Sequence, residues 1–217
     1  MFDLDGVLIE SEQIWDTVRE GLARERGGRW GPGAHRAMMG MSTPEWVAYM
    51  REELGVDMAP GDLAAEVSRR IADRLRHDPP VIPGAPEAVR ALADRWPLGL
   101  ASSSSRPVIE AALTATGLAG VFRATVSSEE VARGKPAPDV FLRAAELLGV
   151  PPARAVAVED STAGIRAAHA AGMAVVAIPN RAYPPDAGVL ALAAEVLDGI
   201  GELTPAVVGR AGAAAAE

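Results

Sequence analysis

The chain has 217 residues, of which 49% are hydrophobic and 23% charged, and its formal net charge is −8. This balance favours a folded domain with a packed core, and it gives no general electrostatic attraction to nucleic acid or to an anionic membrane. The absence of cysteine excludes thiol catalysis, disulfides and cysteine-bound zinc. No stretch approaches the roughly 20 apolar residues of a membrane span, and the N-terminus lacks a basic-then-apolar leader pattern. We therefore expect a cytoplasmic protein that is a monomer or a weak homodimer, with no nucleic-acid or membrane partner.

The first apolar run carries two acids, Asp3 and Asp5, and is predicted to be a strand. Only Met1 and Phe2 precede the first acid, so either the start of the chain is assigned too late or this strand is clipped relative to the usual length of about 5–6 residues. Successive side chains of a strand alternate, so the two acids start on one face. Gly6 then allows the backbone to turn sharply.

The segment 11–78 has no strong strand pattern. Its apolar residues recur at helical spacing, as in Ile14, Val18 and Leu22. We expect an all-helical cap domain over 11–78, inserted into an α/β core domain made of 1–10 and 79–217.

From residue 97 onward, short apolar runs alternate with helical patterns. Strands are expected at 97–101, 124–126, 155–158, 174–178 and 192–197, and helices at 107–116, 138–148 and 161–171. Ser161 is expected to cap the last of these helices. The alternation predicts an α/β fold with a Rossmann-like parallel sheet flanked by helices. The alanine-rich segment 211–217 is expected to be a frayed tail.

Polar side chains follow several of the predicted strands, and active groups gather at the carboxyl ends of strands in open parallel sheets. The candidates are Asp3, Asp5, Ser102, Lys135, Glu159 and Asp160. Clustered carboxylates repel one another unless a cation is present, and Mg²⁺ is the expected ion for oxygen ligands. Such a site suits a phosphate, because a lysine adds a fixed charge and a serine adds a hydrogen bond. A carboxylate in line with phosphorus can then attack it.

This arrangement resembles the haloacid dehalogenase superfamily, specifically its beta-phosphoglucomutase-like phosphatase branch with a helical cap. The matching motifs, in chain order, are Asp3-Leu4-Asp5-Gly6-Val7, Leu100-Ala101-Ser102, Gly134-Lys135-Pro136 and Val158-Glu159-Asp160-Ser161. Together these motifs span almost the whole chain.

The resemblance implies a catalytic pair. Asp3 would be the nucleophile and a metal ligand. Asp5 would be the general acid and then the base, and would also touch the metal through its backbone carbonyl. A resemblance to the dehalogenase branch would imply a motif without the second aspartate. The presence of Asp5 therefore favours phosphoryl chemistry.

The resemblance also implies how the phosphoryl group and the metal are held. Ser102, Ser103 and Lys135 would bind phosphoryl oxygens, and Lys135 would counter the charge of the nucleophile. Glu159 and Asp160 would complete the Mg²⁺ site. The neighbouring Ser104 and Ser105 are expected to be solvated loop or helix-cap residues.

Residues of the predicted cap set expectations about the substrate. Trp15 and Met39 are candidates for the substrate pocket, with core packing as the alternative. In the beta-phosphoglucomutase family a histidine, a lysine and an arginine stand where this chain has Trp15, Met39 and Thr43. Without that cationic cradle, a hydrolase is favoured over a mutase. The Ser-Glu-x-x-Trp pattern at 11–15 is also similar to that of sugar-phosphate phosphatases.

The leading hypothesis is a Mg²⁺-dependent phosphatase that hydrolyses small phosphorylated metabolites, sugar or polyol phosphates, through an aspartyl-phosphate intermediate. The alternatives are a phosphomutase and a non-catalytic relative of the same fold. A mechanism in which a lysine of the cap forms an imine with the substrate is disfavoured, because residues 11–78 contain no lysine. His35, His77 and His169 share no metal-binding spacing.

Overall fold

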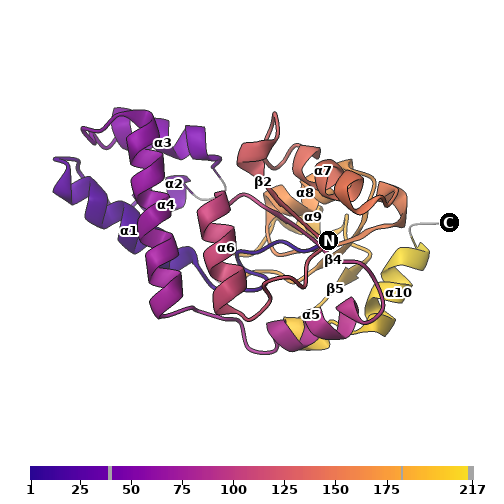
Figure 1. The fold of residues 1–217 in the computed structure, drawn as a ribbon. Helices are drawn as coiled ribbons and strands as arrows, with labels where there is room; N and C mark the ends of the chain where they lie inside the picture. The colour runs from indigo at the N-terminus through magenta and orange to yellow at the C-terminus, as the bar shows by residue number, and fades with distance from the viewer. Residues whose placement is uncertain (39–40, 182, 215–217) are drawn as a thin grey trace.

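The computed structural model describes residues 1–38, 41–181 and 183–214, and its strands form a parallel sheet (Figure 1). The strands are β1 Gly99–Ser102, β2 Ala124–Ser127, β3 Val156–Glu159, β4 Ala174–Ala177 and β5 Glu195–Val196. β1 pairs with β2, and β3 pairs with β4, which pairs with β5, all in parallel. The Rossmann-like α/β prediction is confirmed, although the last strand is two residues long where 192–197 was expected.

The N-terminal residues join these two groups of strands. The Phe2 backbone N–H donates to the carbonyl of Gly99 at 2.8 Å, and the Asp3 N–H donates to the carbonyl of Val158 at 3.0 Å. Phe2 forms parallel bridges with Leu100 on one side and Val158 on the other. The sheet order is therefore β2-β1-(1–3)-β3-β4-β5. Asp3 leaves the sheet at its centre, directly after the bridges formed by Phe2.

Helices account for the regular structure of residues 11–78 within the described part of the chain. They are α1 Glu12–Glu25, α2 Ala34–Met38, α3 Thr43–Glu52 and α4 Pro60–His77. We call residues 12–77 the helical segment; Figure 1 shows its helices together at one end of the molecule. Along α4, residues Leu63, Val67, Ile71 and Leu75 are fully buried. This spacing of three to four residues is that of one helix face, and α4 packs against α1, α3 and α6 (Arg106–Ala115).

The remaining helices cover both faces of the sheet. They are α5 Ala85–Ala93, α7 Asp139–Leu148, α8 Thr162–Ala170, α9 Ala187–Leu190 and α10 Pro205–Ala214, with short 3-10 turns at Ser128–Glu130, Pro152–Arg154 and Ile200–Glu202. Because side chains alternate along a strand, Leu100 and Val158 join the cluster under α5 and α6, whereas Ala101 and Ala157 join the cluster under α7 and α8. Burial on both faces explains the nearly unbroken apolar runs of these strands.

Two expectations about helices were wrong or incomplete. The sequence pattern predicted no helix at 85–93, and it predicted a frayed tail at 211–217, of which 215–217 lie outside the described residues. Residues 211–214 instead belong to α10, in which Ala211 is fully buried. The glycines of this helix lower its intrinsic propensity, but packing of Val207 and Ala211 into the core supports it. Among the described residues, no helix is both long and apolar enough to span a membrane.

Candidate active site

The predicted nucleophile is held by a buried lysine. Lys135 Nζ donates to Asp3 Oδ1 at 2.8 Å and to Glu159 Oε1 at 2.6 Å. Burial lowers the pKa of Lys135, but the two carboxylates outweigh this effect and raise it above its ordinary value. The lysine therefore stays protonated, and it carries a fixed positive charge between two acids that come from different strands.

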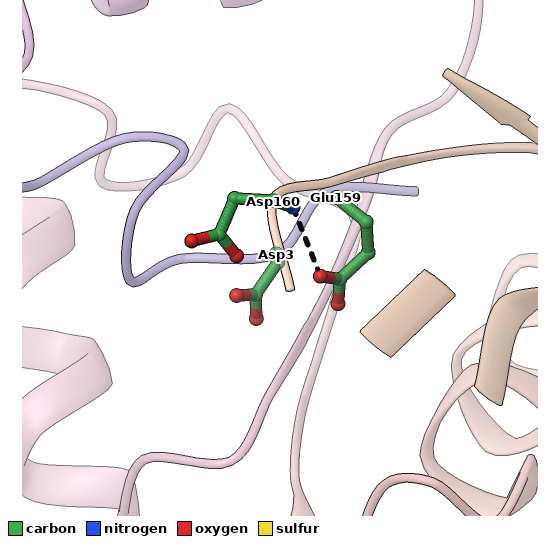
Figure 2. A group of neighbouring side chains, drawn as sticks. All are labelled: Asp3, Glu159 and Asp160. Atoms are coloured by element: carbon green, nitrogen blue, oxygen red, sulfur yellow. Dashed lines mark hydrogen bonds between the residues drawn. The ribbon is translucent and has the colours of Figure 1, made fainter. Parts of the chain in front are cut away.

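Three acids from two strand ends form a compact buried group. Oxygen atoms of Asp3, Glu159 and Asp160 lie within 4.8 Å of one another, and Figure 2 shows the three carboxyl groups side by side. Burial raises the pKa of Asp3 to about 7, with Lys135 opposing the shift and Glu159 adding to it. Burial and the charges of Glu159 and Asp3 raise the pKa of Asp160 well above its ordinary value. Such a set of oxygen donors fits a hard divalent cation, which would relieve the repulsion.

Two glycines make room for this acidic group. Gly6 has φ of 78°, and a Cβ there would lie 2.0 Å from Asp160 Oδ2. A Cβ on Gly164, in the first turn of α8, would lie 1.9 Å from the Glu159 carboxyl group. Both carboxylates therefore pack directly against backbone.

Glu159 is tied down on both of its oxygens. Besides the bond from Lys135, its Oε2 accepts from the backbone N–H of Asp160 at 3.1 Å and from Ser161 Oγ at 3.2 Å. Ser161 Oγ also accepts from the Gly164 N–H at 3.1 Å, which confirms the predicted cap of α8. The strand end and the helix start thus hold one rigid carboxylate.

Asp5 lies outside the acidic group and is held by hydroxyls. Ser104 Oγ donates to Asp5 Oδ2 at 2.8 Å, and Ser11 Oγ donates to Asp5 Oδ1. Ser102 Oγ and Trp15 Nε1 each lie 3.5 Å from an Asp5 oxygen. Asp5 is therefore oriented from both the turn after β1 and the start of the helical segment.

The serines at the end of β1 and in the turn that follows differ in part from what the sequence predicts about their exposure. Ser104 and Ser105 are buried, so the expectation of a solvated loop was wrong, whereas Ser105 is the N-cap residue of α6, as the expectation of a helix cap has it. Ser102 is fully buried, and its Oγ accepts from the Ser104 N–H at 3.0 Å. Ser103 is exposed and lines the cavity described next, as does Ser104. A phosphoryl-binding role for Ser102 and Ser103 stays a prediction.

A cavity of about 150 Å³ lies between the strand ends and the helical segment. On the sheet side it is lined by Asp3, Asp5, Ser103, Ser104, Asp160 and Ser161, and on the other side by Ser11, Glu12, Trp15, Arg19, His35, Met38, Met41 and Trp46. Trp15 is thus at the cavity, as predicted. Met39 lies outside the described residues. The acids that the sequence placed far apart share one small cavity with side chains of α1, α2 and α3.

The family follows from the sequence comparison. A profile of the haloacid dehalogenase-like hydrolases matches residues 1–172, which include all the motifs above. The chain belongs to this family.

Named relatives of this haloacid dehalogenase-like hydrolase cover most of its length. It is 32% identical to fructose-1-phosphate phosphatase YqaB of Escherichia coli (strain K12), over 81% of this chain and 93% of that protein. It is 33% identical to hexitol phosphatase B of the same strain, over 82% of each chain. The crystal structure of CbbY from Rhodobacter sphaeroides in complex with phosphate has a TM-score of 0.85 and 27% identity, covering 96% of this chain and 97% of that chain.

The sequence did not single out two side chains that line the hydrolase's cavity, Arg19 and His35. Arg19 lies over the rings of Trp15 and Trp46, with 4.5 and 4.8 Å from its Cζ to the ring centroids. His35 makes a hydrogen bond with Asp16 through Nδ1, and its Nε2 lies 2.7 Å from the Tyr183 hydroxyl oxygen. Arg19 stands four residues after Trp15 on the predicted helix, which is the spacing of one face, so its place beside the tryptophan was readable from sequence. The contact of His35 with a loop some 150 residues away was not.

Proposed function

We propose that this hydrolase is a Mg²⁺-dependent phosphatase of small phosphorylated metabolites, working through an aspartyl-phosphate on Asp3. The observation that carries the proposal is the Asp3 carboxylate, which is bonded to Lys135 and lines one cavity with Asp5 and Asp160. The names of the fructose-1-phosphate and hexitol phosphatases support sugar or polyol phosphates as substrates.

The described residues fit a divalent metal. Asp3 and Asp160 offer carboxylate oxygens at the cavity, Asp5 would add its backbone carbonyl, and Glu159 would complete the site while holding Lys135. A bound Mg²⁺ supplies charge that neutralises phosphoryl oxygens.

The chain's own residues divide the chemistry between two acids. An Asp3 oxygen forms a bond to phosphorus as the bond from phosphorus to the ester oxygen breaks, and Asp5 gives its proton to that leaving oxygen. In the second half, Asp5 takes a proton from a water whose oxygen bonds to phosphorus as the bond from phosphorus to the Asp3 oxygen breaks, which releases inorganic phosphate and regenerates the Asp3 carboxylate. Ser102, Ser103 and Lys135 would hold the phosphoryl oxygens throughout.

We assign residues 11–78 the role of a cap domain over a core domain of 1–10 and 79–217. Support comes from two contacts that bridge these parts: Thr43 Oγ1 donates to Glu129 Oε1 at 2.8 Å, and His35 meets Tyr183. Closure of such a cap would exclude water while Asp3 is phosphorylated. The cytoplasmic location, the monomeric or weakly dimeric state and the absence of nucleic-acid and membrane partners stay predictions from the sequence.

The decisive experiment is Asp3→Asn with phosphate release measured on sugar and polyol phosphates. The variant should lose at least about 1,000-fold in kcat, because the amide is no nucleophile toward phosphorus. It should stay folded by circular dichroism, since a buried carboxylate is exchanged for a neutral group of the same shape. Unchanged turnover would remove Asp3 as nucleophile. Interconversion of sugar 1- and 6-phosphates without phosphate release would identify a phosphomutase instead.

A further inference from the structure

We propose that Arg19 selects the substrate: packed against the rings of Trp15 and Trp46, it donates hydrogen bonds from its free N–H groups to hydroxyl oxygens of the leaving group. The proposal rests on the proposed phosphatase activity and extends it to the other end of the substrate. It makes polyhydroxy monophosphates the preferred substrate class.

Arg19 is a buried cation that has no hydrogen-bonding partner among the described residues. The residue is only 9% exposed, and its Nε has no acceptor. No hydrogen bond or ion pair joins Arg19 to any residue within the described ranges 1–38, 41–181 and 183–214. Arg24, on the same helix, shows the ordinary alternative, an exposed guanidinium paired with Glu20 at 2.6 Å. A buried donor left unpaired is costly, and the terminal N–H groups, which have no acceptor among the described residues, are available to a ligand in the cavity that Arg19 lines.

Two tryptophan rings, inclined to each other, border the guanidinium. Contact with aromatic rings uses the faces of a guanidinium, whereas its N–H donors lie in the plane at the edge. The rings of Trp15 and Trp46, which are inclined by 66° to each other, therefore restrict the guanidinium from two sides and leave donors at its edge available. Because Arg19 lines the same cavity as Asp3 and Asp5, these donors serve the end of the substrate that extends from the phosphoryl group toward the helical segment.

The charges around Arg19 favour a neutral acceptor over a second anion. Burial lowers the pKa of Arg19 to about 10, and Asp16, Glu12 and Asp5 oppose that shift, so the residue stays cationic near neutral pH with three carboxylates offsetting its charge. A second phosphate would add about 1.5–2 negative charges beside these acids. Hydroxyl oxygens accept the same bonds without added charge, and Glu12, which also lines the cavity, offers an acceptor for their hydrogens.

The test compares two leaving groups in the wild type, Arg19→Met, Arg19→Lys and the control Arg24→Met. With a hexitol phosphate, Arg19→Met should raise KM about 10- to 100-fold with little change in kcat. Arg19→Lys, which keeps the charge and loses the planar fork, should raise KM less. With p-nitrophenyl phosphate, whose leaving group has no hydroxyl array, every variant should match the wild type within about twofold. Arg24→Met should match it on both esters.

The other outcomes overturn the proposal in distinguishable ways. Equal losses on both esters would make Arg19 a structural residue, and unchanged KM on both would remove it from substrate binding. A larger loss on a hexose bisphosphate or a carboxylate-bearing monophosphate than on the hexitol phosphate would show an anion anchor. Wild type without activity on any ester would overturn the proposed function as well, whereas an active wild type with an indifferent Arg19→Met overturns only this inference. If Arg19→Met does not fold, Arg19→Lys decides.

Discussion

Neighbouring serines of the turn after β1 differ in what their hydroxyls contact. Ser104 Oγ reaches Asp5 Oδ2 at 2.8 Å, whereas Ser105 Oγ is buried without a hydrogen-bond partner in the described chain. A bond to a charged acceptor is worth more than an average one, about 1.5–3 kcal/mol. Alanine at position 104 therefore removes a hydroxyl that bonds the proposed acid–base residue, whereas alanine at position 105 removes one that does not.

Ser104→Ala should lower kcat about tenfold, because Asp5 loses one of the hydroxyls that orient it. Ser105→Ala should leave kcat unchanged and raise the melting temperature slightly, because it removes an unpaired buried hydroxyl. Steady-state phosphate release and thermal unfolding of both variants check this. If the two substitutions had equal effects on kcat, the bond from Ser104 would have no part in positioning Asp5.

The first turn of α8 shows how an element serves the acidic group. Its N-cap Ser161 and its backbone at Gly164 enclose the Glu159 carboxylate, which is fully buried. Gly164 has helical backbone and ordinarily would be a weak choice in a helix. The carboxylate that packs against it explains why a side chain cannot stand there.

Gly164→Ala should therefore destabilise the protein by about 1–3 kcal/mol, in the range of overpacked cores. It should also weaken the binding of Mg²⁺, because Glu159 and Lys135 must shift together. The matched control is Gly209→Ala in α10, where a Cβ would meet nothing within 4 Å, and which should gain about 0.5–1 kcal/mol. Urea unfolding and activity against Mg²⁺ concentration measure both effects; a Gly164→Ala protein as stable as the wild type would contradict the packing argument.

In the whole molecule, residues 1–3 pair with β3, and this pairing places several negative charges close together in the interior. Asp3, Glu159 and Asp160 are buried around a single lysine, Lys135. The pKa of Asp3 is about 7 in the fold, against an ordinary value of 3.8. Between these two values the folded state binds more protons than the unfolded chain, so the stability of the metal-free protein falls as pH rises.

Mg²⁺ should reverse this trend, because it binds the deprotonated acids and competes with protons. We expect the rise in melting temperature on adding Mg²⁺ to be larger at about pH 8 than at about pH 5. Thermal unfolding with and without Mg²⁺ at both pH values measures it, and Asp3→Asn should show a smaller rise. Equal stabilisation at both pH values would show that the ion does not bind at these carboxylates.

The sequence was sufficient for the parallel α/β fold, for the helical character of 11–78 and for the acidic group. These features depend on local patterns: apolar runs, helical spacing, and acids placed directly after strands, whose carboxyl ends must meet in a parallel sheet.

Tertiary structure alone decided the helix at 205–214, the roles of the serines and the surroundings of Arg19. The serines of the turn are chemically identical and adjacent, so only the position of Asp5 distinguishes Ser104 from Ser105. Burial of Arg19 needs Trp46, which lies on another helix and is brought near by packing. Local pattern determines where elements form and which residues their ends present, whereas contacts between residues distant in sequence depend on how those elements pack.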